Sequence, residues 1–196
     1  MKNLYIFRHG QTDLNVQNVW QGSQINAELN ETGINQAKAL KEKLISLEIE
    51  GIYSSPLCRA LQTAILANPN PVATYIYPDL QECNFGVAEG LTFEKAEQRY
   101  PEIVYAMFHP TPDKWYKKFP GNSSESKKEV FERVKIALAN ICRDTSFSKL
   151  GISTHAAVMS SLFAGTGHYS TPVPNCCVAH FTYDEEKDIL SFVEIL

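Results

Sequence analysis

The sequence predicts an α/β fold: a three-layer α/β/α sandwich with a mostly parallel sheet and a small helical insertion. Short β-branched or aromatic runs alternate with segments whose apolar residues recur at helical spacing, which is typical of sheets covered by helices on both faces. Hydrophobic residues make up 44 % of the 196 residues, enough for a substantial core. We therefore expect a single domain over residues 1–196, with an insertion or lid at about 84–122.

In the first half of the chain, predicted strands alternate with predicted helices. Strands are expected at about 3–8, at 51–55, where Pro56 closes the run, and at 72–77. The helix between the first two strands has Thr32 as its expected cap. Its apolar stripe consists of Ile34, Ala37, Leu40, Leu44 and Leu47. A second helix is expected over 58–67, so the order is that of a sheet with helices on both faces.

The second half begins with the predicted insertion, which is rich in aromatic residues, proline and charge. Short helical signals occur near 93–100 and 102–108. Ser126 and Glu129 then fit a capping box at the start of a long amphipathic helix. A fourth strand is expected at 150–154, a helix at 156–164, and two final strands at 176–183 and 189–195, joined by a charged turn.

Composition argues against several classes of partner. The net charge is -4 without a basic run or stripe, so we expect no nucleic-acid partner. No stretch approaches the ~20 apolar residues of a membrane span, so we expect no membrane partner. The 5 cysteines are odd in number and lack a C-x-x-C pair, which predicts reduced thiols and a cytoplasmic location. Adjacent Cys176 and Cys177 fall in a predicted strand, where they would point to opposite faces, and this argues against a metal clamp.

Side chains capable of chemistry follow successive predicted strands. Arg8 and His9 end the first strand, Arg59 follows the second, Glu82 the third and His155 the fourth. In sheets of this kind, ligands bind beyond the carboxyl ends of the strands. Each residue has an ordinary structural explanation, because a lone histidine after a strand is usually hydrogen-bonded or on the surface. Their recurrence at equivalent positions nevertheless indicates one site.

These residue types suit the chemistry of a phosphoryl group. Arginine can fork onto phosphate oxygens, and an imidazole can act as a nucleophile. Phosphoryl transfer needs mainly in-line positioning and charge stabilisation on the non-bridging oxygens. Arg8, Arg59 and His155 can together cover those oxygens.

Segments along the chain resemble the motifs of the histidine phosphatase superfamily, which includes the phosphoglycerate mutases. Residues 8–12 (RHGQT) with Asn15 resemble its signature, and residues 53–64 (YSSPLCRALQTA) resemble its second motif. Residues 80–90 (LQECNFGVAEG) are similar to its acid/base segment, and Ser153-Thr154-His155 is similar to its last catalytic block. The resemblance extends from residue 4 to about 181.

The resemblance implies roles for individual residues. His9 would attack phosphorus and become a phosphohistidine, while Glu82 would act first as general acid and then as general base, with Glu89 as the rival carboxylate. The implied catalytic residues are His9, Glu82, His155, Arg8 and Arg59. The implied substrate-binding residues are Arg8, Asn15, Gln21, Gly22, Arg59, Glu82 and His155. No metal and no cofactor are expected, because the arginines supply positive charge.

Two departures from the family pattern concern the pocket. Ala156 stands where the family usually has glycine after the last catalytic histidine, and a need there for positive φ or for close approach of the backbone would alter the pocket. The family's Pro-Gly-Gly-Glu-Ser run is lengthened to residues 120–126, which we expect to tune substrate access more than chemistry.

We therefore predict a phosphomonoesterase, a histidine acid-type phosphatase that acts on a small phosphorylated metabolite. The chain is shorter than family mutases, whose insertion shields the phosphoenzyme from water, so a more open phosphohistidine should hydrolyse. Mutase-like transfer and non-catalytic binding of a phosphorylated ligand are the alternatives. Trp115, Tyr116, Lys117 and Lys118 are either a lid that selects the substrate or an ordinary surface patch. A homodimer is left open.

Overall fold

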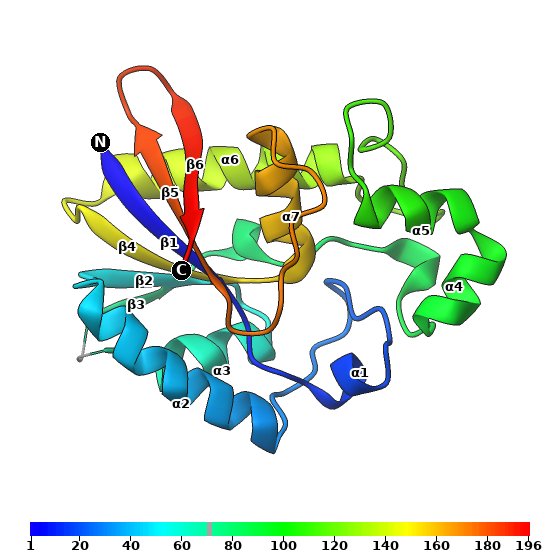
Figure 1. Cartoon of the computed structure of the whole chain (residues 1–196), viewed down its shortest axis with the longest axis horizontal. Helices are drawn as coiled ribbons and strands as arrows, with labels where there is room; N and C mark the ends of the chain where they lie inside the picture. The colour runs from blue at the N-terminus through cyan, green and yellow to red at the C-terminus, as the bar shows by residue number, and fades with distance from the viewer. Residues whose placement is uncertain (70–71) are drawn as a thin grey trace.

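A six-stranded sheet forms the centre of the molecule, and the computed structural model describes residues 1–69 and 72–196 (Figure 1). The strands are β1 (Lys2–Arg8), β2 (Gly51–Ser54), β3 (Thr74–Ile76), β4 (Lys149–Thr154), β5 (Val178–Asp184) and β6 (Ile189–Ile195), in the order β3-β2-β4-β1-β5-β6. β1, β4, β2 and β3 run parallel, whereas β5 is antiparallel to both of its neighbours. The carboxyl ends of the first four strands therefore meet at one edge of the sheet.

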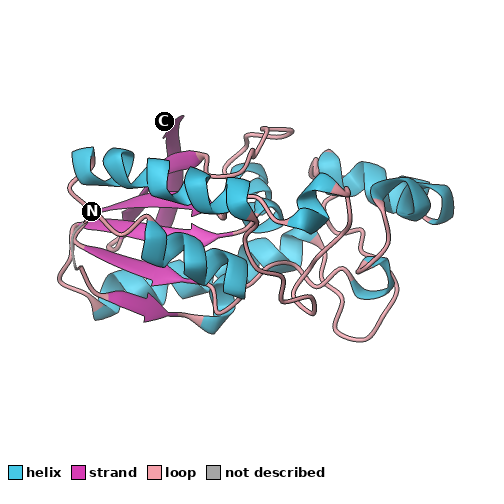
Figure 2. Ribbon diagram, turned by 90° about the horizontal axis from the view of Figure 1, so that it is seen from below, coloured by secondary structure: helices cyan, strands magenta, loops and turns pink. Residues whose placement is uncertain are grey.

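Helices cover both faces of the sheet (Figure 2), which confirms the three-layer prediction. The covering helices are α2 (Glu31–Ser46), α3 (Cys58–Leu66), α6 (Lys127–Asp144) and α7 (Ala156–Gly165). Alternation along β1 explains the layers: Leu4 and Ile6 join the core under α6 and α7, whereas Tyr5 and Phe7 join the core under α2. β1 is thus anchored on both faces and can hold side chains firmly at its end.

A helical lobe lies beyond the carboxyl ends of the parallel strands (Figures 1 and 2). It contains α1 (Asp13–Val16), η1 (Pro78–Leu80), η2 (Gly86–Ala88), α4 (Phe93–Arg99) and α5 (Pro101–Phe108). Trp20 packs at its centre, with the rings of Phe85, Phe93, Phe108 and Phe119 at centroid distances of 4.6, 4.9, 5.8 and 5.3 Å. The segment after β1 and the insertion after β3 therefore share one aromatic core. The single-domain organisation of residues 1–196 stays a prediction.

Most predicted boundaries are close to those of the structure. Ser126 caps α6, and its hydroxyl and the Glu129 carboxylate satisfy each other's backbone N–H groups, which confirms the predicted capping box. The predicted cap Thr32 is wrong: Asn30 is the N-cap of α2, and its side chain accepts a hydrogen bond from Gly33 N at 2.9 Å. Thr32 lies in the first turn instead.

Two strand predictions were too long. The third strand spans only Thr74–Ile76 rather than 72–77. The fifth begins at Val178, after Cys176 and Cys177, and Cys176 has φ +57°. The expected alternation of the two cysteines across a sheet is therefore wrong, because their backbone turns before the strand starts. None of the helices in the described ranges is long and apolar enough to cross a membrane.

Candidate active site

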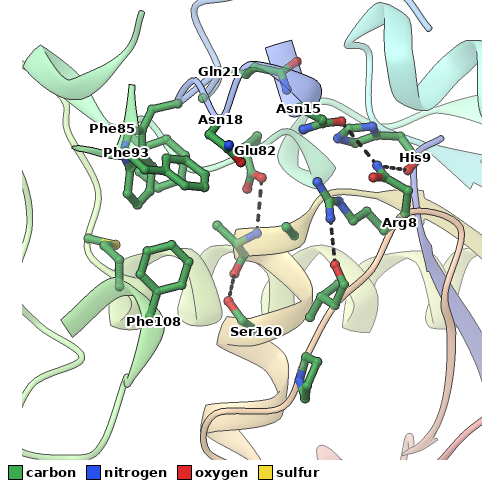
Figure 3. Close-up of a pocket in the computed structure, with 18 of the residues that line it drawn as sticks. Arg8, His9, Asn15, Asn18, Gln21, Glu82, Phe85, Phe93, Phe108 and Ser160 are labelled. Carbon is green, nitrogen blue, oxygen red and sulfur yellow. Dashed lines mark hydrogen bonds between the residues drawn. The ribbon is translucent and has the colours of Figure 1, made fainter. Parts of the chain in front are cut away.

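The side chains predicted at the strand ends gather at one edge of the sheet. Arg8, His9, Arg59 and Glu82 line a cavity of about 680 Å³ that lies between the sheet and the helical lobe (Figure 3). His155 is fully buried beside it, and its ring centroid lies 5.3 Å from that of His9. The parallel topology thus brings together residues that are up to 147 positions apart, counted from 8 to 155.

One ring nitrogen of His9 makes a hydrogen bond, and the other keeps its lone pair for a ligand. Its Nδ1 lies 2.7 Å from the carbonyl oxygen of Gly10, which can only accept, so Nδ1 carries the proton and Nε2 keeps its lone pair. Burial lowers the pKa of His9 well below its usual value, and the cationic Arg59 and Arg8 lower it further. A Cβ at Gly10 would clash with the carbonyl of Gly33, so only glycine fits this turn. His9 is therefore held neutral, with one nitrogen available.

The two arginines, one buried and one half-buried, are cations with unused donors. Arg59, the second residue of α3, is 1 % exposed and donates to the carbonyls of Ile25 and Gly22, both at 2.8 Å. Arg8 donates to the carbonyl of Val173 at 2.8 Å. Burial lowers the pKa of Arg59 to about 10 and also lowers that of Arg8. Within the described residues neither guanidinium has a carboxylate within salt-bridge distance, so an anion in the cavity would meet unpaired positive charge.

The structure separates the two candidate carboxylates. Glu82 faces the cavity (Figure 3), and its oxygens accept hydrogen bonds from Cys83 N at 2.8 Å and Ala157 N at 3.2 Å. Glu89 does not line the cavity and instead accepts from the backbone N–H groups of Gln24 and Phe85. Only Glu82 of this pair can reach a ligand bound at His9.

His155 is placed by Ser55, at the end of β2. Its Nε2 lies 2.7 Å from the Ser55 hydroxyl, while its Nδ1 is buried and has no hydrogen-bond partner in the part of the chain that is described. A buried nitrogen without a partner is costly unless a ligand supplies one. Burial lowers the pKa of His155 well below its usual value, and Arg59, His9 and Arg8 add to that effect.

The remaining predicted binding residues also line the cavity. The side-chain oxygen of Asn15 accepts from Thr12 N at 3.1 Å, and that of Gln21 accepts from the Thr12 hydroxyl at 3.1 Å. The carbonyl of Gly22 accepts from Arg59. Their amides and backbone thus form the wall that holds Arg59 and the turn after β1.

Ala156 does not adopt the positive φ that a glycine at this position would have allowed. It is the first residue of α7, it lines the cavity, and its φ is not positive. Position 156 therefore needs no positive φ. Relative to glycine, Ala156 adds one methyl group to the cavity wall.

The residues predicted to be either a lid or a surface patch lie away from the cavity. Lys117 pairs with Glu102 and Lys118 with Glu129, and Tyr116 is exposed. None of Trp115, Tyr116, Lys117 and Lys118 lines the cavity that contains His9.

The individual residues of the outer wall of that cavity were not predicted, although four of them fall within the insertion predicted at 84–122. This wall is formed by Phe85, Phe93, Met107 and Phe108 of the helical lobe and by residues 170–173 between α7 and β5. The helical signals at 93–108 could have located the first group, but no pattern marked the loop. The lengthened run at 120–126 does not line the cavity either; its Glu125 accepts a hydrogen bond from Asn84 N at 3.0 Å and so braces the segment after Glu82.

No metal site accompanies these residues within the described chain, because no three histidine, cysteine, aspartate or glutamate side chains gather there as ligands would. The cavity instead combines two guanidinium groups, a neutral imidazole and a carboxylate. Such a set can hold an anion, attack it and transfer a proton.

Comparisons with known proteins agree with this arrangement. The model of the histidine phosphatase superfamily (branch 1) matches residues 4–195. The uncharacterized phosphatase PhoE of Bacillus subtilis is 28 % identical over 195 residues, covering 95 % of this chain and 91 % of that protein. A metal-independent phosphoserine phosphatase of Arabidopsis thaliana is 31 % identical over 163 residues, covering 82 % and 66 %.

Solved structures show the same fold. YhfR of Bacillus stearothermophilus superposes with a TM-score of 0.82 at 26 % identity, covering 98 % of this chain and 95 % of that one. A mycobacterial glucosyl-3-phosphoglycerate phosphatase complexed with VO3 has a TM-score of 0.82 at 23 % identity, covering 100 % and 97 %. The second likeness supports the fold alone.

Proposed function

The chain belongs to the histidine phosphatase superfamily, and we propose that it is a phosphomonoesterase that hydrolyses a small phosphorylated metabolite through a phosphohistidine on His9. One observation carries this proposal: the free Nε2 of a neutral His9 shares a cavity with unpaired Arg8 and Arg59 and with the Glu82 carboxylate. A relative named for phosphoserine supports a small phosphomonoester as substrate.

In the first step, His9 Nε2 attacks phosphorus in line with the ester oxygen. The phosphorus–oxygen ester bond breaks, a nitrogen–phosphorus bond forms, and Glu82 gives its proton to the leaving alcohol. Arg8, Arg59 and His155 stabilise the charge on the non-bridging oxygens, with the partnerless Nδ1 of His155 as its donor. Asn15, Gln21 and Gly22 hold the wall around them.

In the second step, the Glu82 carboxylate takes a proton from water while the water oxygen attacks phosphorus. The nitrogen–phosphorus bond breaks, inorganic phosphate leaves, and His9 and Glu82 return to their starting protonation states. Glu82 therefore serves as acid and then as base without a metal ion.

Assignment to the acid type rests on the protonation of His9. The lowered pKa of His9 keeps its nucleophilic nitrogen free in mildly acidic solution. The acidic limb of the pH profile of kcat/KM should therefore lie well below pH 6.5, the ordinary histidine value. Steady-state kinetics on an aryl phosphate from pH 3 to 9 measures it, and a limb centred at that ordinary value would contradict the assignment.

The decisive experiment is phosphate release from phenyl phosphate. We expect turnover that a chelator does not change and that His9→Ala abolishes, with His168→Ala as the matched control because His168 is exposed and outside the cavity. Retained turnover in His9→Ala would refute the nucleophile. Activity that requires a bisphosphorylated primer and releases little phosphate would indicate mutase-like transfer, and binding without turnover would indicate a phospho-ligand receptor.

A further inference from the structure

Lys127 is a buried cation that the proposed reaction does not use. It is the first residue of α6, it is 4 % exposed, and it lines the cavity that contains His9 and Glu82. Its Nζ donates to the Ser160 hydroxyl and to the carbonyl of Ala157 at 3.4 Å. An ammonium group has three N–H donors, so one is left over.

The charge of Lys127 has no counter-ion among the residues that the structure describes. Across residues 1–69 and 72–196, no carboxylate lies within salt-bridge distance of its Nζ. A buried charge without a partner is costly, and a bound anion would relieve that cost. Burial lowers the pKa of Lys127, and an anion beside it would raise that pKa again.

The position of Lys127 corresponds to the leaving-group side of the cavity. Ala157 connects the two groups: its N–H donates to Glu82, and its carbonyl accepts from Lys127. In Figure 3, Ser160, the other partner of Lys127, lies below Glu82, and both are well separated from His9. A substrate whose phosphoryl group is held at His9 and whose ester oxygen is at Glu82 therefore has its leaving group at the end of the cavity where Ala157 and Ser160 hold Lys127.

The surroundings strengthen the attraction. Phe85, Phe93, Met107 and Phe108 line the same cavity, and such apolar walls keep the effective dielectric constant low. A volume of about 680 Å³ also leaves room for a leaving group well beyond the phosphoryl oxygens.

We propose that Lys127 is a second anion-binding site, which holds a carboxylate or a second phosphate on the leaving group of the substrate. This inference rests on the proposed phosphomonoesterase and narrows its substrate to an alcohol that bears an oxyanion. The rival role is structural, in which Lys127 only ties α6 to α7. Lys2 shows what such a role looks like: it is also buried, but it donates to the carbonyls of Thr145 and Phe147 and lines no such cavity.

The test compares aryl phosphates that differ in one charge. Two probes carry a second anionic group: carboxyphenyl phosphate, as its meta and para isomers, and phenylene bisphosphate. Carbamoylphenyl phosphate replaces the carboxylate by a neutral amide of the same shape, and phenyl phosphate is the reference. We expect wild-type kcat/KM to favour an anionic probe over the carbamoyl probe, and Lys127→Met to reduce that preference by about 10- to 100-fold, as for a hydrogen bond between charged groups. A carboxylate preference identifies one source of the anion, and a bisphosphate preference identifies the other.

Control variants distinguish anion binding by Lys127 from a structural role, and a control substrate tests the proposed hydrolysis separately. Lys128→Met, at the exposed neighbouring position, should keep the preference. Lys127→Gln, which retains donors for Ala157 and Ser160, provides the neutral variant if Lys127→Met does not fold. A wild-type enzyme without any preference, or an equal loss on charged and neutral probes in the variants, overturns the Lys127 site. Failure of the wild type to hydrolyse phenyl phosphate would instead overturn the phosphomonoesterase.

Discussion

At the scale of single residues, the two neighbouring glutamates show how position decides chemistry. Glu82 and Glu89 both accept two backbone hydrogen bonds, and both lie in the segment after β3. Only Glu82 faces the cavity, because one of its donors is Ala157 at the start of α7, next to His155. The proposed proton transfers therefore belong to Glu82 alone.

The role of Glu82 as proton donor predicts that the effect of Glu82→Gln depends on the leaving group. We expect kcat/KM to fall by about 10²- to 10⁴-fold for alkyl phosphates, whose alcohols need a proton, and far less for nitrophenyl phosphate, whose phenolate leaves unaided. Stopped assays across a series of leaving groups measure the dependence. Glu89→Gln is the matched control and should change all substrates by the same factor; an equal loss across the series in Glu82→Gln would rule out the general acid.

The residues of the proposed reaction could be predicted from the sequence because each lies at the end of a parallel strand or within a few residues after it. His9 and Arg59 lie in local motifs, and the parallel topology determines where they meet. Lys127 could not be predicted. In the sequence it is one polar residue at the start of an amphipathic helix, and only the packing of α6 against α7 buries it. Burial of this kind depends on the tertiary structure and not on spacing.

At the scale of elements, strands and helices were predicted where periodicity is strong, and their ends were not. Asn30 and Thr32 are both good cap residues, and the choice between them depends on where the chain enters α2. The residues of the outer wall were not predicted because Phe85, the N-cap of η2, and Phe108, the last residue of α5, belong to different elements that meet around Trp20. Their aromatic character was visible in the sequence, but their common cavity was not.

A clamp between α6 and the segment after β3 holds Glu82 in place. Arg133 of α6 donates to both Glu125 oxygens at 2.7 and 2.9 Å and to the carbonyls of Asp79 and Gln81 at 2.6 and 3.2 Å. Glu125 in turn accepts from Asn84 N. The backbone on each side of Glu82 is therefore tied to one guanidinium group, which makes Arg133 a positioning residue.

Arg133→Met should therefore impair proton transfer without contacting the substrate. We expect kcat/KM to fall by about 10- to 100-fold, with the greater loss for poor leaving groups, because a small displacement of a catalytic group is costly. Arg133→Lys should recover part of the rate, and Arg143→Met, exposed on the same helix, should leave it unchanged. A loss that is the same for every leaving group would mean that Arg133 only stabilises the fold.

At the scale of the whole molecule, the buried histidines of the site link function to stability. His9 is 3 % exposed and His155 is 0 % exposed, and burial beside two arginines lowers the pKa of both. The site is preorganised for a dianion, so in its absence the fold contains like charges at close range. The hydrophobic core formed by α6, α7, β1 and β4 has to offset this repulsion.

This arrangement predicts how the free energy of unfolding depends on pH. Above pH ~6.5, histidines are neutral in both the folded and the unfolded chain, so the stability that His9 and His155 contribute is fully present. As the pH falls below that value, the unfolded chain takes up protons that the folded His9 and His155 refuse, so stability is lost until the pH reaches their lowered folded pKa values. The loss is at most about 1.4 kcal/mol per pH unit for each histidine.

Urea unfolding between pH 7.5 and 5 measures this loss of stability. His9→Gln should make the slope shallower whereas exposed His168→Gln should not, and a slope that His9→Gln leaves unchanged would show that His9 takes its proton in the folded state as readily as in the unfolded one.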